Sequence, residues 1–111
     1  MEFNEVLALR KSVRRYTKEI VSQEDEKAML DAAMASSVGK HNDGGYNLVV
    51  VRDREILDLI AKEEKEETGG GDPLFGAPLL FLICRTKEAV DYLMRYDAGI
   101  IAEHIHLKAA E

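Results

Sequence analysis

The 111-residue sequence contains little of several residue types that mark common protein classes. Its single cysteine, Cys84, excludes an internal disulfide, and the apolar run around it predicts a buried, inert thiol. The formal net charge of -6 argues against general nucleic-acid binding, because that needs a basic surface to neutralise phosphates. No signal peptide is recognisable, and no apolar stretch approaches the roughly 20 residues that span a bilayer. We therefore expect a soluble protein in a reducing, cytoplasmic setting, with no nucleic-acid or membrane partner.

What the sequence does contain is an alternation of helix and strand patterns. Apolar residues at helical spacing predict helices over 2–11, 22–36, 53–67 and from 88 or 92 to 111. Short apolar runs predict strands over 47–51 and 79–84. Ser22 and Asp53 are expected to cap the second and third helices at their N-termini. No repeat or boundary divides the chain. The order therefore predicts one domain over 1–111, of α+β or α/β class, with a sheet between helices.

Two of these elements are apolar enough to need cover on more than one side. The strand over 47–51 is a continuous apolar run, which predicts that both of its faces are covered. The last helix is apolar around most of its circumference, and such a helix needs cover on several sides. Two strands and three preceding helices are too little for this. We therefore expect that the sequence stops before its fold is complete.

A basic segment stands out in this acidic chain, because Arg10–Arg15 holds four basic groups and a hydroxyl in six residues. In an extended segment the side chains of Ser12 and Arg14 point to the same face, and Arg10 at the helix end can swing to that side. A guanidinium fork matches phosphate oxygens, and a serine adds a neutral donor. The three side chains can therefore clamp one phosphate. The alternative is a basic helix C-terminus, stabilised by the negative end of the helix dipole.

Other patterns in the chain indicate no chemistry. The three glycines at 69–71 lack the spacing of a phosphate-binding loop, and no Lys-Ser or Lys-Thr pair follows them. His104 and His106 are two positions apart on a predicted helix and point about 200° apart, so they cannot share a metal on one face. His41, in the loop after the second helix, is a weaker candidate for a binding site. We expect no metal site and no catalytic acid–base pair.

Three stretches of the sequence, taken in order, resemble the nitroreductase family. They are Leu9–Tyr16 with its sequel Ile20–Ser22, then Leu74–Leu80, and finally Tyr96–Ile105. Each motif is weak alone, but together they cover nearly the whole chain. The resemblance implies the N-terminal part of an α+β nitroreductase-like fold, with a central sheet flanked by helices and the C-terminal part missing. In that family the residues matching Arg10, Lys11, Ser12 and Arg14 bind the phosphate and ribityl chain of FMN.

The sequence departs from the family pattern at the loop that holds the flavin ring. Many members have a Pro-Ser-x-x-Asn-x-Gln-Pro-Trp type of loop, and the Gln-Pro-Trp is absent from 36–46 here. A subgroup with an Ala-Ser-Pro-Val-Gly-like loop is closer. On that alignment Ser36, Ser37 and Val38 lie near the flavin, through backbone groups. The family's Gly-Leu-Gly-type segment and its late basic residue would lie beyond Glu111.

The resemblance implies an FMN-dependent oxidoreductase that passes a hydride from NAD(P)H through the flavin to a nitroaromatic, a quinone or a similar acceptor. It also implies a homodimer, because family members build the flavin site from both subunits. Two alternatives remain open. The chain is a non-catalytic flavin-binding or subunit-interaction module, or it belongs to a flavin enzyme of the same superfamily with another acceptor, such as a dehalogenase. In each case the cofactor carries the chemistry, so no catalytic side chain is expected.

Overall fold

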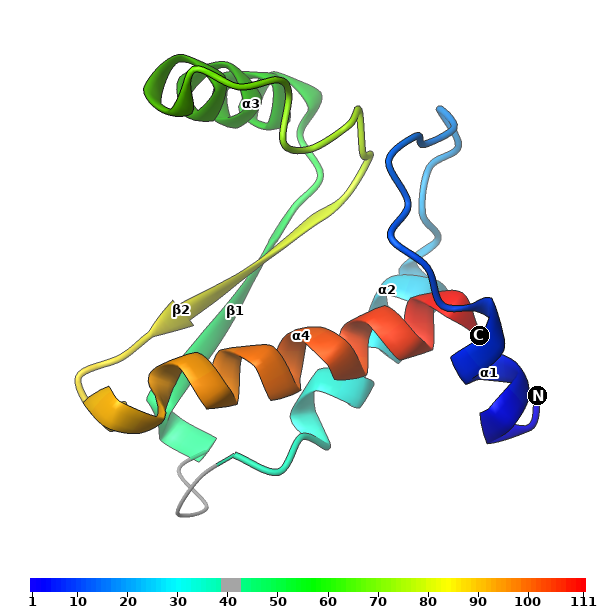
Figure 1. Ribbon diagram of the computed structural model, residues 1–111, viewed down its shortest axis with the longest axis vertical. Coiled ribbons are helices and arrows are strands. Elements are labelled where there is room, and N and C mark those ends of the chain that lie inside the picture. The colour runs from blue at the N-terminus through cyan, green and yellow to red at the C-terminus, as the bar shows by residue number, and fades with distance from the viewer. Residues whose placement is uncertain (39–42) are drawn as a thin grey trace. The chain divides into compact units, whose positions relative to one another are not determined.

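The computed structural model describes residues 1–38 and 43–111, and their elements follow the predicted order (Figure 1). The elements are α1 (Phe3–Leu9), α2 (Gln23–Met34), η2 (Asp43–Gly45), β1 (Tyr46–Val51), α3 (Arg54–Thr68), β2 (Leu80–Arg85), η3 (Asp91–Leu93) and α4 (Met94–Ala110), with η marking 3-10 helices. The predicted α+β class is confirmed. Among the described helices, none is long and apolar enough to cross a membrane.

β1 and β2 pair with each other to form a two-stranded sheet in the described part of the chain. The strands are antiparallel, because the backbone N–H of Thr86, just after β2, donates to the carbonyl of Gly45, just before β1, at 2.9 Å. The Thr86 hydroxyl also donates to the Gly44 carbonyl at 2.6 Å. The expectation that both faces of β1 are covered is wrong, since Val49 is 43% exposed. A two-stranded sheet offers this apolar run too little neighbouring surface.

The chain separates into two compact units. The first unit comprises Met1–Lys11, Ser22–Leu48 and Ile83–Glu111, and the second comprises Ser12–Val21 and Val49–Leu82. Each strand therefore contributes residues to both units. The expectation of a single domain over 1–111 stays a prediction.

The first unit is built on the packing of α2 against α4, and α1 contacts the same helix. Ala33 of α2 and Ile101 of α4 are each 5% exposed, as is Val6 of α1. The small Ala33 side chain lets the two helix backbones approach closely. Ser22 caps α2 as predicted, because its hydroxyl accepts the backbone N–H of Asp25 at 3.0 Å. These contacts form the larger of the two cores.

The second unit is built around α3. Asp53 caps this helix as predicted, with one carboxylate oxygen accepting the backbone N–H groups of Glu55 at 2.8 Å and Ile56 at 3.2 Å. The helix ends at Gly69, whose φ of 70° lies in the left-handed region that glycine adopts without strain. Leu57 is fully buried at 0% exposed. The charged end of α3 over 62–67 is exposed, as its composition predicts.

Two local expectations need correction. Cys84 is half-buried rather than buried, because it lies on a two-stranded sheet. The last helix begins at Met94, later than the predicted 88 or 92, because Asp91–Leu93 forms a 3-10 turn first. Both differences depend on neighbouring structure that a local sequence pattern does not contain.

Candidate functional site

The first two residues of the predicted phosphate-binding segment, Arg10 and Lys11, directly follow the end of α1. The helix begins at a reciprocal cap, in which the backbone N–H of Glu2 donates to the carboxylate of Glu5 at 3.0 Å. At Arg10 the backbone leaves the helix with φ -59° and ψ 128°, an extended conformation. Arg10 is half-buried and Lys11 is exposed. The helix therefore ends at Leu9, two residues before the predicted end at Lys11.

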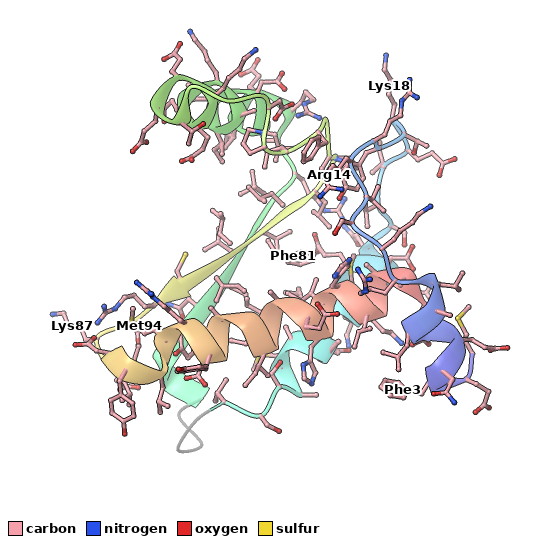
Figure 2. All side chains as sticks on the ribbon, in the orientation of Figure 1. Phe3, Arg14, Lys18, Phe81, Lys87 and Met94 are labelled. Atoms are coloured by element: carbon pink, nitrogen blue, oxygen red, sulfur yellow. The ribbon has the colours of Figure 1, made fainter. Side chains whose placement is uncertain are left out.

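Ser12 and Arg14 follow in the second unit, in a stretch without helix or strand (Figure 2). Both residues are exposed. The structure thus describes the two halves of the predicted segment separately. The covalent chain joins the two halves at the peptide bond between Lys11 and Ser12.

The four predicted phosphate ligands have free donor groups. Within the described residues, the side chains of Arg10, Lys11, Ser12 and Arg14 make no hydrogen bond and no ion pair. Two arginines elsewhere in the second unit do make such bonds. The Arg52 guanidinium donates to the Val21 carbonyl at 2.7 Å, and the Arg54 guanidinium pairs with the Asp58 carboxylate at 2.9 Å. Guanidinium, ammonium and hydroxyl groups of this kind match the oxygens of a phosphate.

The predicted ring-side residues follow the end of α2. Ser36 and Val38 form a tight turn, in which the Val38 backbone N–H donates to the Ser36 carbonyl at 3.1 Å. The Ser36 hydroxyl is buried and has no hydrogen-bond partner among the described residues. Ser37 points into solvent. The turn therefore separates Ser37 from the other two residues, although the family alignment groups all three.

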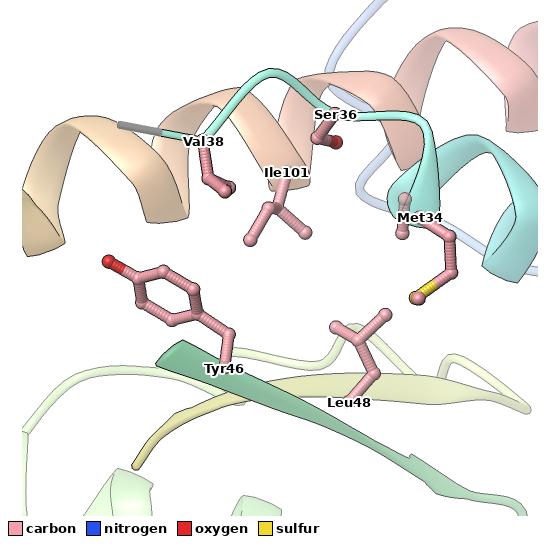
Figure 3. Close-up of a pocket in the computed structure, with 7 residues that line it drawn as sticks. Met34, Ser36, Val38, Tyr46, Leu48 and Ile101 are labelled. Carbon is pink, nitrogen blue, oxygen red and sulfur yellow. The ribbon is translucent and has the colours of Figure 1, made fainter. Parts of the chain in front are cut away.

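Ser36 and Val38 open onto a small pocket in the first unit, between the end of α2, β1 and α4 (Figure 3). Its volume is about 40 Å³. The lining residues are Ala33, Met34, Ser36, Val38, Tyr46, Leu48 and Ile101. A pocket of this size holds one or a few water molecules, whereas small-molecule sites measure roughly 300–1,000 Å³. By itself the pocket is therefore too small to hold a flavin ring.

Tyr46, which lines this pocket, belongs to a part-buried polar pair. The Tyr46 hydroxyl of β1 donates to the carboxylate of Asp97 on α4 at 2.8 Å, and Asp97 is 3% exposed. Burial, and then the hydrogen bond to this carboxylate, raises the pKa of Tyr46 to about 12. Tyr46 therefore keeps its proton at physiological pH, and the pair ties β1 to α4. Asp97 therefore has a structural role in the first unit.

One contact near the predicted segment could not be inferred from the sequence. On α4, His106 Nε2 lies 3.1 Å from the backbone carbonyl oxygen of Lys11, and Nδ1 lies 3.3 Å from the Glu103 carboxylate. His106 and Lys11 are 95 positions apart, and no spacing rule links them. His104 instead places Nδ1 at 2.8 Å from the Ile100 carbonyl in its own helix. The candidate His41 lies outside the described residues.

Comparison with known proteins gives matches in structure alone. No family model matches the chain, and no curated protein matches it.

The chain is similar to an FMN-dependent nitroreductase from Clostridium difficile R20291, with 31% identity and a TM-score of 0.81, over 95% of this chain and 58% of the other. A nitroreductase family protein from Clostridium difficile 630 has 25% identity and a TM-score of 0.79, over 99% of this chain and 63% of its own. A nitroreductase with bound FMN from Bacteroides fragilis shares the fold, with a TM-score of 0.84 at 19% identity, over 99% of this chain and 65% of that one. The chain thus spans less than two thirds of the length of these proteins. Its structure matches those of nitroreductase family proteins over nearly all of this chain.

Proposed function

We propose that the chain binds FMN as part of an oxidoreductase that passes a hydride from NAD(P)H through the flavin to an electron-poor acceptor, such as a nitroaromatic or a quinone. The observation that carries the proposal is the set of free donors at Arg10, Lys11, Ser12 and Arg14. Support comes from a structural relative whose name states FMN dependence. When bound, the flavin supplies the two-electron chemistry, and the protein supplies binding and orientation.

Each predicted residue has a defined task in this proposal. The guanidinium groups of Arg10 and Arg14 and the hydroxyl of Ser12 bind the phosphate, because charge-assisted hydrogen bonds to phosphate oxygens are short and strong. Lys11 binds at the same phosphate and ribityl end. The turn over 36–38 contacts the ring through backbone groups of Ser36, Ser37 and Val38. No side chain of the chain needs to transfer a proton for the hydride to move.

We also propose that the protein is a cytoplasmic homodimer. The apolar residues of α1 support a dimer, because Phe3 is 65% exposed and Leu7 is 46% exposed. Exposed apolar surface of this kind favours association with another protein surface. Sedimentation of the 111-residue chain tests this directly. A monodisperse monomer over a wide concentration range would contradict the dimer.

The colour of the purified protein tests the main proposal. We expect the chain to become yellow when FMN is added and the excess removed, and to bleach when NADH or NADPH follows. A sample that retains no flavin would overturn the proposal. A yellow sample that does not bleach would favour the alternative, a non-catalytic flavin-binding module.

A pair of matched arginine variants tests the phosphate site. Arg14→Ala removes one charge-assisted partner of the phosphate, which costs on the order of 1.5–3 kcal/mol and weakens FMN binding roughly 10- to 150-fold. Arg15→Ala removes the same charge from the next exposed position, whose side chain points to the opposite face of an extended segment. We expect this control to change the dissociation constant much less. Equal losses in the two variants would show that only overall charge matters and that the clamp is misassigned.

A further inference from the structure

The two ring nitrogens of His106 both face hydrogen-bond acceptors. Nε2 lies 3.1 Å from the carbonyl oxygen of Lys11, and Nδ1 lies 3.3 Å from a carboxylate oxygen of Glu103. Neither partner can donate a proton at neutral pH. A neutral imidazole carries one N–H, whereas the imidazolium ion carries two. Only the charged form of His106 can therefore make both hydrogen bonds.

The surroundings of His106 contain charges of both signs. Glu103 faces it from α4 itself, one helical turn earlier. At the end of α1 stand Arg10, which is half-buried, and Lys11. On α2, Glu26 is the one ionisable side chain that is not exposed. The side chain of His106 is 37% exposed, so it can exchange its proton with solvent.

We infer that His106 is a positioning residue for the proposed phosphate site, and that it works in its protonated form. As the imidazolium ion, it links the Lys11 backbone to Glu103 on α4. This link holds the peptide that joins Lys11 to Ser12, in the middle of the proposed phosphate-binding segment. The inference rests on the proposed function, because the FMN phosphate is the anion that the segment would bind.

Loss of the proton changes this arrangement in a defined direction. A neutral ring keeps one of the two hydrogen bonds, so either the Lys11 carbonyl or the Glu103 carboxylate loses its partner. FMN affinity should therefore fall when a rise in pH removes this proton. Since His106 acts through the Lys11 backbone, it need not touch the flavin.

Flavin titrations of the full 111-residue chain test the inference. We would measure the FMN dissociation constant by fluorescence between about pH 5.5 and 8.5 for wild type, His106→Gln and His104→Gln. The phosphate of FMN itself titrates near pH 6, so each value is divided by that of His106→Gln at the same pH. The dissociation constant of wild type, divided by that of His106→Gln, should rise about 3- to 10-fold from the acidic to the alkaline end of the range. This is the change expected for the loss of one hydrogen bond.

His104→Gln is the matched control for this titration. His104 lies on the same helix and is also half-buried, but its Nδ1 bonds the Ile100 carbonyl of its own helix. It should therefore follow the wild-type pH dependence. A wild-type ratio that stays flat while FMN binds would overturn the inference.

A measurement without flavin separates this inference from the proposed function. The amide of Ser12 shares its peptide group with the Lys11 carbonyl, so its nitrogen and proton NMR shifts report on the bond from His106. In the flavin-free chain these shifts should follow the titration of the His106 ring. They should stop doing so in His106→Gln and continue in His104→Gln. Ser12 amide shifts that do not follow the titration of the His106 ring would overturn the inference, whether or not FMN binds. A Ser12 amide that follows His106, in a protein that never binds FMN, overturns the proposed function instead.

Discussion

The two units of the chain have interiors of different construction. The first unit buries apolar side chains from three helices, including Val6, Ala33 and Ile101, together with the charged Asp97. In the second unit, two apolar side chains reach the same level of burial, Leu57 at 0% and Ala77 at 9% exposed. The first core is therefore distributed over several elements and includes a polar pair. The second depends on one large side chain.

The difference also affects the proposed phosphate-binding segment, which belongs partly to each unit. On the side of the first unit, His106 contacts the Lys11 backbone. On the side of the second unit, Ser12 and Arg14 are exposed, and their side chains make no hydrogen bond or ion pair with the described residues. The backbone of one half thus contacts α4, while the side-chain donors of both halves are free for a ligand. Free donors are useful in a binding site, because the protein gives up no internal bond when the ligand arrives.

The dependence of the second core on Leu57 can be tested by removing that side chain. Leu57→Ala should lower the free energy of unfolding by about 2–5 kcal/mol, because it deletes buried methyl groups and leaves a cavity. Urea denaturation followed by circular dichroism measures the loss.

The neighbouring residue supplies the control. Ile56 lies on the same helix but is 49% exposed. Ile56→Ala should change stability by roughly 0.5 kcal/mol or less, since the lost contacts are few and alanine favours the helix. Similar losses in both variants would show that Leu57 is no special anchor of the second unit.

The polar pair of the first unit should give the next largest effect. Tyr46→Phe removes the hydroxyl that donates to Asp97 at 2.8 Å while keeping the ring in place. The buried carboxylate then loses one donor, which costs about 1–3 kcal/mol. Thermal and urea unfolding of this variant measure the change. Tyr96→Phe is the control, because Tyr96 is 71% exposed and should tolerate the same loss of a hydroxyl. A Tyr46→Phe protein as stable as wild type would mean that the pair contributes nothing to the first core.

The same pair predicts how stability responds to alkaline pH. The pKa of Tyr46 is raised from 10.0 to about 12 in the folded protein, by burial first and then by Asp97. A group whose pKa is higher in the folded state adds stability that is complete below its unfolded pKa and is lost as pH rises through the folded value. Stability should therefore fall between pH 10.0 and about 12, and more steeply in wild type than in Tyr46→Phe. Denaturation curves of both proteins across this range test the difference, and parallel curves would contradict it.

The parts of the fold that local chemistry controls could be predicted from the sequence. Ser22 and Asp53 were expected to cap helices, and both do, because a cap depends on a side chain and the next three backbone amides. The exposure of Val49 and the half-burial of Cys84 could not be predicted. Both depend on which elements cover the sheet, and an apolar run alone does not contain that information. The 3-10 turn over 91–93 was missed for the same reason.

The candidate site also combines features that could be predicted from the sequence with contacts that could not. The donor set over Arg10–Arg14 is visible in the sequence, because it needs only basic residues at alternating positions of one short segment. The link from His106 to Lys11 and the pair of Tyr46 with Asp97 join residues 95 and 51 positions apart. Contacts of that separation follow from how helices pack. The residues themselves carried no signal that they would meet.

Each of the two units has a helix with a side-chain N-cap, Ser22 in the first and Asp53 in the second. Substituting these caps should affect stability less than the changes above. One Asp53 oxygen accepts two backbone N–H groups of α3, at 2.8 and 3.2 Å, whereas the Ser22 hydroxyl accepts one of α2, at 3.0 Å. Each substitution by alanine should cost about 1 kcal/mol. Asp53→Ala should cost more than Ser22→Ala, because it also removes a negative charge from the positive end of a helix dipole. Added salt should narrow this gap, since screening weakens the charge effect but leaves the hydrogen bonds. If Ser22→Ala proves the more costly change at every salt concentration, the first unit depends on local capping more than its distributed core suggests.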